Sequence, residues 1–242
     1  MISKNQQKYV RQLEQKKYRM REQAFVAEGP KVVGDLLKCG FNPIMLFSTR
    51  QWAGIDTTEV TEEELRKLSF LQHPQQVLAV FPIPTNTKTP PLKGQLYLAL
   101  DGIQDPGNLG TIIRIADWFG IDTIYCSTET VDVWNPKVVQ ATMGSIARVK
   151  VVYTDLEVLI RECELPVYGT LLDGEDIYEQ QLSNDGIIVM GNEGNGISTD
   201  IRPLIAQKLL IPNFRTGDDT AESLNVAIAT AITCSEFKRR KS

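Results

Sequence analysis

Polar residues suited to binding a ligand occur in three short stretches whose neighbours are mostly apolar. The stretches read Asn108-Leu-Gly-Thr-Ile-Ile-Arg114, Gly191-Asn-Glu-Gly-Asn-Gly-Ile-Ser198 and Ser223-Leu-Asn225-Val. An arginine can bind two oxygens of one phosphate with its planar guanidinium group, and Glu193 adds a carboxylate held between glycines. These residue types favour a binding site for a polar ligand that carries phosphate.

Each stretch also has a purely structural explanation. Arg114 could be a surface residue paired with Asp117 three positions later, where such a pair adds roughly a few tenths of a kcal/mol. The glycine-rich stretch could be only a turn. Ser223 could cap the helix that follows it, with Asn225 in the first turn. Taken one at a time, the stretches leave both explanations open.

The elements around the stretches indicate where they lie in the fold. Apolar runs at residues 95–100 and 186–190 precede the first and second stretches, and both are typical of buried strands. After the first run we expect a turn and then a helix that has Asn108 as its N-cap and ends near Gly120. Its predicted apolar face consists of Ile112, Ile115, Ala116 and Phe119. In such a unit, ligands bind beyond the carboxyl ends of the strands.

The C-terminal part of the chain alternates predicted strands with helical patterns. Strands are expected near residues 96–100, 123–126, 149–153, 167–171, 187–190 and 208–211. This alternation predicts an α/β fold with a mostly parallel sheet that is covered by helices on both faces. Asn135 is expected to cap one of the helices, since Pro136 follows it.

A proline-rich stretch at residues 82–91 is typical of a semi-rigid linker and separates this part from a smaller N-terminal module. In the module we expect helices from Tyr9 to about Ala24, over residues 30–38 and after a capping box at Thr61. A short strand and turn are expected at residues 25–29, and further strands at residues 44–47 and 76–81. The predicted domains are residues 1–82, a linker of residues 83–94, and residues 95–242.

Length and composition fit a soluble globular protein, with 242 residues of which 42% are hydrophobic and 23% charged. No stretch approaches the roughly 20 uncharged residues that span a membrane, and the first residues are polar, so we expect a cytoplasmic protein. His73 is the only histidine, and the cysteines at positions 39, 126, 163 and 234 lie far apart. Neither a Cys/His zinc site nor a disulfide framework is therefore expected.

The formal net charge of −4 by itself argues against a nucleic-acid partner, but the charge is unevenly distributed. Residues 1–21 contain seven basic residues and one acidic residue, and residues 238–241 are all basic. Because cations bind phosphates and aromatic rings stack on bases, the N-terminal run with Tyr9 and Tyr18 favours an RNA-binding surface. A solvated helix and an ordinary basic tail are the alternative.

The sequence argues against three other kinds of site. The glycines at residues 191–196 are spaced G-x-x-G-x-G, the reverse of the dinucleotide-binding fingerprint, and they occur late in their domain. No G-K-[ST] phosphate loop occurs. Asp218 and Asp219 could form a metal pair, but adjacent acidic residues in a polar loop are usually solvated, so no metal is expected.

Taken together and in order, the three stretches resemble the three motifs of the SpoU family of RNA 2′-O-ribose methyltransferases, in the SPOUT superfamily. The third motif includes Ile211-Pro212 and Glu222, which precede Ser223. The resemblance covers residues from about 95 to 237, and the first module looks like the family's N-terminal substrate-binding domain of the ribosomal-protein L30e type. The implied fold is a SPOUT α/β domain with a deep trefoil knot, a rare exception to the usual topology rules, plus a small α/β L30e-like domain.

The resemblance implies an enzyme that uses S-adenosylmethionine, needs no metal and acts as a homodimer. The implied catalytic residues are Arg114, Asn108, Glu193, Ser223 and Asn225. The implied cofactor-binding residues are Gly191, Gly196, Ile211, Leu224 and Asn225. We expect Arg114 to orient the target phosphate and ribose and to stabilise developing negative charge, because a guanidinium keeps its proton. The predicted dimer surface is the helix over residues 224–237, for which core packing is the alternative.

The expected substrate is structured RNA, with ribosomal RNA favoured over transfer RNA because of the separate N-terminal module. The alternative is an RNA-binding protein of the same fold without methyl transfer, although such a protein need not keep the polar residues of the motifs. Two departures from the family pattern affect local geometry. The loop at residues 213–221 looks longer and more charged than usual, and Gln76 stands where the family often has glycine.

Overall fold

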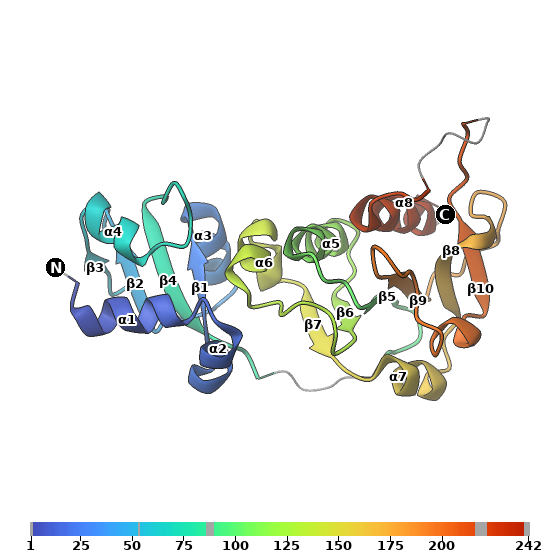
Figure 1. Ribbon diagram of the computed structural model, residues 1–242, viewed down its shortest axis with the longest axis horizontal. Coiled ribbons are helices and arrows are strands. Elements are labelled where there is room, and N and C mark those ends of the chain that lie inside the picture. The colour runs from blue at the N-terminus through green and yellow to red at the C-terminus, as the bar shows by residue number, and fades with distance from the viewer. Residues whose placement is uncertain (1, 53, 86–89, 216–221, 240–242) are drawn as a thin grey trace. The chain divides into compact units, whose positions relative to one another are not determined.

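The structure is a computed structural model that describes residues 2–52, 54–85, 90–215 and 222–239 (Figure 1). The chain forms two compact units, one of residues 1–85 with 132–148, and one of residues 86–131 with 149–242. The segment 132–148, which is predicted to lie in the C-terminal domain, thus packs with the N-terminal module. The structure does not describe residues 216–221, so Asp218, Asp219 and most of the unusual loop lie outside it.

The first unit is built on a four-stranded sheet in the order β1-β4-β2-β3. Its strands are β1 (Ala24–Glu28), β2 (Met45–Ser48), β3 (Thr58–Glu59) and β4 (Val77–Pro82). Its helices are α1 (Lys4–Gln12), α2 (Lys16–Glu22), α3 (Pro30–Lys38), α4 (Glu62–Leu68) and α6 (Pro136–Ala141), with a 3₁₀ turn η1 (Ser145–Ala147). β4 pairs antiparallel with β1 and β2, while β2 and β3 are parallel. The capping box at Thr61 and the cap at Asn135 are confirmed.

The single helix predicted from Tyr9 to about Ala24 is wrong, because the chain breaks into α1 and α2. The guanidinium of Arg19 explains the break: its Nη1 donates to the carbonyl oxygens of Leu13 and Glu14 at 2.8 and 2.6 Å. These carbonyls are therefore satisfied by a side chain where the helix stops. Arg19 also forms a buried ion pair with Asp132 at 2.6 Å, so a residue from the segment 132–148 fixes the turn.

Gln76 adopts the left-handed backbone conformation that usually favours glycine, with φ of 50°. Its carbonyl oxygen accepts hydrogen bonds from Thr49 N–H at 2.9 Å and from Ser48 Oγ at 3.0 Å. The turn before β4 thus keeps a glycine-like conformation with a glutamine in place.

The second unit is built on a six-stranded sheet in the order β10-β8-β9-β5-β6-β7, in which every neighbouring pair is parallel. The strands are β5 (Leu96–Asp101), β6 (Thr123–Cys126), β7 (Lys150–Tyr153), β8 (Val167–Asp176), β9 (Gly186–Gly191) and β10 (Gln207–Leu210). The other elements are α5 (Pro106–Trp118), α7 (Leu156–Glu162), the 3₁₀ turn η2 (Arg202–Leu204) and α8 (Val226–Arg239). The predicted mostly parallel α/β fold is confirmed.

Helices cover both faces of this sheet (Figure 1). On one face, Leu156 and Ile160 of α7 pack into a core with Ala99 and Val189 of the central strands. On the other face, α5 and α8 lie side by side (Figure 1). The trefoil knot implied by the family resemblance stays a prediction. No helix in the part of the chain that the structure describes is both long and apolar enough to cross a membrane.

Two predicted helix starts are wrong by a few residues. The N-cap of α5 is Asp105, whose side chain accepts the N–H of Asn108 at 2.8 Å, and Asn108 lies in the first turn. The side chain of Asn225 accepts the N–H groups of Ala227 and Ile228, so Asn225 caps α8 where Ser223 was expected. Both shifts leave the polar side chains of the motifs at the helix starts, where they can reach other loops.

Candidate active site

The first two motifs meet at the carboxyl edge of the parallel sheet. Asp101, the last residue of β5, is in register with Gly191, the last residue of β9, although 90 positions separate them. The strands that follow β5 in the sequence, β6 and β7, lie on one side of it in the sheet, and β9 lies on the other side. The strand order therefore reverses between β5 and β9. Open parallel sheets bind ligands at such a point.

A chain of hydrogen bonds joins all three motifs. Asn108 donates from Nδ2 to Oε1 of Glu193 over 2.9 Å. Asn225 donates from Nδ2 to Oδ1 of Asn108 over 3.0 Å. Because Asn225 Oδ1 accepts from the first N–H groups of α8, each amide has its oxygen and nitrogen facing complementary partners. The structure therefore brings Asn108, Glu193 and Asn225 together, one residue from each motif.

The helices α5 and α8 run parallel and begin at this chain. Asn108 and Asn225 meet near the two helix starts, and Lys238 Nζ lies 3.5 Å from the carbonyl oxygen of Gly120 near the two helix ends. Each helix carries a partial positive charge at its N-terminus. Both charges favour a carboxylate such as Glu193 or an anionic group of a ligand at this edge of the sheet.

The glycines of the second motif are required by its backbone. A Cβ on Gly191 would lie 2.2 Å from the carbonyl carbon of Gly196, so no side chain fits there. Gly196 has φ of 68°, and its backbone pairs with that of Asn192 in both directions. The loop turns tightly back on itself and leaves the exposed side chain of Glu193 at its outer end.

Arg114 is exposed on α5, six residues beyond Asn108, which is about 9 Å further along the helix axis. Among the described residues it has neither a hydrogen-bonding nor an ionic partner, so the alternative ion pair with Asp117 is not formed. The structure does not join Arg114 to the amide chain. The Arg114 guanidinium, which has no such partner in the described part of the chain, remains available for an anionic ligand.

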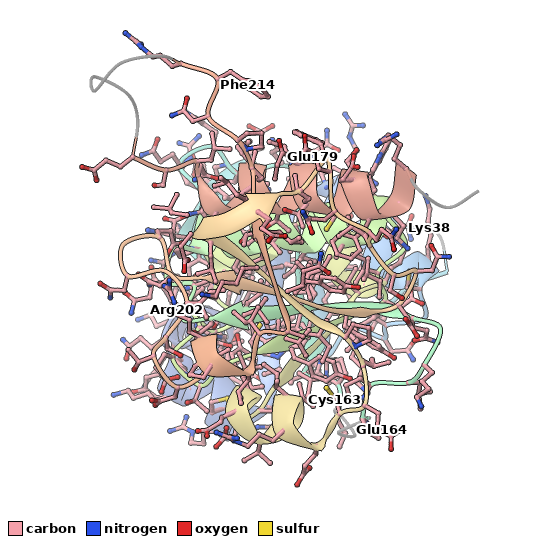
Figure 2. All side chains as sticks on the ribbon, turned by 90° about the vertical axis from the view of Figure 1, so that its right-hand side faces the viewer. Lys38, Cys163, Glu164, Glu179, Arg202 and Phe214 are labelled. Carbon is pink, nitrogen blue, oxygen red and sulfur yellow. The ribbon has the colours of Figure 1, made fainter. Side chains whose placement is uncertain are left out.

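The remaining predicted residues flank the loop that is only partly described. Ile211 is half-buried and directly follows β10, at the same edge of the sheet. Ser223 and Leu224 are exposed and precede the cap Asn225. After β10 the chain leaves the sheet, and Phe214 in this segment is 84% exposed (Figure 2).

Two residues that bind the loops together, Asp101 and Asn192, were not predicted from the sequence. Asp101 is buried, and its Oδ2 accepts the N–H of Ser198 at 2.7 Å. Asn192 donates to the carbonyl oxygen of Gly102 at 2.7 Å. The available signal for Asp101 was its position directly after a buried apolar run. The signal for Asn192 was its position between Gly191 and Glu193.

These features fit S-adenosylmethionine. The carboxylate of Glu193 suits a ligand with positively charged sulfonium and ammonium groups. A Cβ built on Gly196 meets no atom within 4 Å, so the loop backbone is open to a ligand on that side. Among the described residues, no group of three or more His, Cys, Asp or Glu side chains could hold a metal ion.

A parallel sheet with a tight glycine loop and two helix starts at its carboxyl edge defines an α/β enzyme that binds a small cofactor. Comparison with known proteins gives the family. The chain belongs to the SpoU rRNA methylase family, which it matches over residues 95–235. Residues 4–79 match the MRM3-like substrate binding domain. The protein is accordingly an RNA methyltransferase with S-adenosylmethionine as its cofactor.

Three relatives that match nearly the whole of this chain illustrate the similarity. The 23S rRNA (guanosine(2553)-2′-O)-methyltransferase RlmP of Bacillus subtilis is 32% identical, over 95% of each chain. A solved TrmH-family structure from Porphyromonas gingivalis is 42% identical over 100% of both chains, with a TM-score of 0.87. The S-adenosylmethionine-bound rRNA methyltransferase of Sinorhizobium meliloti is 32% identical, covers 100% of this chain and 97% of its own, and has a TM-score of 0.88.

Proposed function

We propose that the protein methylates a ribose 2′-hydroxyl of ribosomal RNA. The observation that carries this proposal is the chain from Glu193 through Asn108 to Asn225, because it unites the three motifs in one polar site. The similarity to RlmP of Bacillus subtilis over nearly the whole chain supports a 2′-O position and a ribosomal substrate. The separate substrate-binding unit supports ribosomal over transfer RNA.

S-adenosylmethionine supplies an electrophilic methyl group when it is bound. We assign its binding to the backbone of Gly191, Gly196, Ile211 and Leu224 and to Asn225. Within the described part of the chain Arg114 has no hydrogen-bonding or ionic partner, so its guanidinium can bind the phosphate beside the target ribose and stabilise negative charge on the ribose oxygen. Glu193, Asn108 and Asn225 hold the polar wall of the site, and Ser223 adds a hydroxyl next to it.

The basic N-terminus contributes to RNA binding with fewer residues than its composition suggests. Arg19 is unavailable to RNA, because it forms the buried ion pair with Asp132. Arg11 donates to the carbonyl oxygen of Ser69 at 2.6 Å and covers the ring of Phe70. The exposed basic residues left for phosphates are Lys4, Lys8, Lys16 and Lys17, because Arg21 pairs with Glu22 at 2.6 Å. Deleting residues 1–21 would remove Arg19 and core residues, so point substitutions are the proper test of this surface.

The protein is proposed to act as a homodimer through α5 and α8. Trp118 and Ile228 are 84% and 53% exposed on these helices, and a second copy would cover them. Val226, by contrast, is buried in the unit's own core, so only part of the predicted helix face is available to a second copy. The tucked chain of the trefoil knot would lie in the same unit.

Incubation of the protein with S-adenosylmethionine labelled in its methyl group and, in separate reactions, with ribosomal RNA and with transfer RNA tests the function. Nucleoside digestion should give label in a 2′-O-methylated nucleoside. Label on a base would contradict the ribose position, and label in transfer RNA alone would contradict the ribosomal substrate. Binding of RNA without any transfer would favour the alternative, an inactive RNA-binding protein of the same fold.

A further inference from the structure

Asn192 is a half-buried residue whose side chain hydrogen-bonds to both loops of the site. Its Nδ2 donates to the carbonyl oxygen of Gly102, in the loop that follows β5, over 2.7 Å. Its Oδ1 accepts the N–H groups of Gly194 and Asn195, in its own loop, at 2.9 and 3.0 Å. One amide group therefore folds the glycine-rich loop and joins that loop to the neighbouring one.

Asp101 makes the reciprocal connection. Its buried carboxylate, at the end of β5, accepts the N–H of Ser198 beyond the glycine-rich loop at 2.7 Å. The anchor for Asn192 is itself fixed, because the N–H of Gly102 donates to Ser127 Oγ at 2.9 Å. Each loop thus holds the other through one side chain, and the distance between the two loops is set.

Asparagine meets the demands of position 192 through its shape and its two kinds of polar atom. Position 192 needs an oxygen with two lone pairs for the N–H groups of Gly194 and Asn195, and a donor for the Gly102 carbonyl oxygen. Aspartate has the same shape but lacks the donor and would place a negative charge against that carbonyl oxygen. Alanine would leave two donors and one acceptor without their partner.

The next residue in the chain is Glu193, which accepts the hydrogen bond from Asn108. We infer that Asn192 is a positioning residue for methyl transfer, which acts by holding Glu193 at the distance where the chain through Asn108 to Asn225 closes. This inference rests on the proposed function. It adds that the second motif is held to the loop that follows β5 through an amide as well as through the sheet.

The test uses Asn192→Asp and Asn192→Ala in the full chain, with Glu193→Gln and the two double variants. The matched control is Asn184→Asp, because Asn184 is exposed before the opposite end of β9 and gains the same charge. Measurements are kcat, KM for S-adenosylmethionine, its Kd by calorimetry, and thermal unfolding. Each Asn192 variant should lose at least tenfold in kcat/KM for S-adenosylmethionine, and Asn184→Asp should stay within twofold of wild type.

The double variants separate positioning from a general structural role. If Asn192 acts through Glu193, its substitution should cost much less in the Glu193→Gln background, a departure from additivity of at least fivefold. Additive losses, or Asn192 variants within twofold of wild type, would overturn the inference. Absence of RNA methylation by the wild-type protein would instead overturn the proposed function, while the effect of Asn192 on the Kd of S-adenosylmethionine could still be measured.

Discussion

Asn108 and Asn225 are 117 positions apart and share a hydrogen bond of 3.0 Å between their side-chain amides. The orientation of both amides follows from the groups at the two ends of the hydrogen-bond chain that the amides form. The N–H groups at the start of α8 require an oxygen, and the carboxylate of Glu193 requires a donor. The two asparagines connect these ends in the one arrangement that pairs every group.

Replacing Asn108 by aspartate should break this arrangement. A carboxylate at position 108 still accepts from Asn225 but faces the carboxylate of Glu193, where a donor is needed. We expect a loss of at least tenfold in kcat/KM for S-adenosylmethionine, equivalent to about 1.4 kcal/mol. Steady-state methyl transfer measures it, with Asn184→Asp as control, and unchanged activity in Asn108→Asp would contradict the role of the chain.

Arg114→Ala should reduce turnover without affecting stability or cofactor affinity, because the side chain is exposed and forms no hydrogen bond or ion pair with the residues that the structure describes. Loss of one group that stabilises developing charge typically costs about 100-fold or more in kcat. Single-turnover methylation and calorimetry with S-adenosylmethionine give the two numbers. Arg161→Ala, on α7, is the control, and full turnover by Arg114→Ala would exclude the proposed role.

Arg19→Met should destabilise the first unit, since it leaves the carboxylate of Asp132 buried without its partner. The Arg19 side chain is 2% exposed and that of Asp132 is 9% exposed. Removing one member of a buried pair costs about 3 kcal/mol or more, whereas an exposed pair contributes little. Denaturant unfolding should show the loss for Arg19→Met and less than about 0.5 kcal/mol for Arg21→Met. Equal losses of unfolding free energy in the two variants would show that the buried ion pair contributes no more to stability than an exposed one.

The buried carboxyl of Glu28 should make stability depend on pH. Burial raises its pKa above the ordinary value of 4.5, while the hydrogen bonds from Ser69 and Phe70 and the charge of Arg11 oppose the rise. The folded state therefore binds this proton more tightly than the unfolded chain. The resulting stabilisation is complete below pH 4.5 and is lost as the pH rises through the raised pKa.

Comparing unfolding free energies of wild type and Glu28→Gln across this pH range tests that sign. The advantage of wild type over Glu28→Gln should shrink as the pH rises above 4.5. Glu59→Gln, at an exposed strand residue, measures the effect of removing a surface charge. A difference that grows with pH would mean that the hydrogen bonds outweigh the burial.

Ile228→Glu should dissociate the proposed homodimer, because a charge on the exposed part of α8 would be buried at the interface. Light scattering should give the mass of one chain for this variant and of two chains for the wild type. Val158→Glu, a comparable substitution at a residue of α7 that is 48% exposed, should leave the mass unchanged. A wild-type monomer, or an Ile228→Glu dimer, would contradict the interface.

Local sequence patterns were sufficient where neighbouring residues decide the structure. The six strands of the second unit, the helix after Pro30 and the capping box at Thr61 all follow from short-range periodicity and capping. The order of the three motifs predicted the family and the cofactor. Local patterns did not predict that Asn225, and not Ser223, caps α8, because both residue types favour a helix start.

The sequence by itself determined which residue types are available, where the strands lie and that three polar motifs follow them. Only the tertiary structure decided that Asp101 meets Gly191, that Asn192 holds Gly102, and that Arg19 breaks a helix by pairing with Asp132. Strand order and buried pairs depend on residues about a hundred positions apart, whose contacts are set by packing of the whole unit. Local propensity contains no information about such contacts, since it reports only the preferences of neighbouring residues.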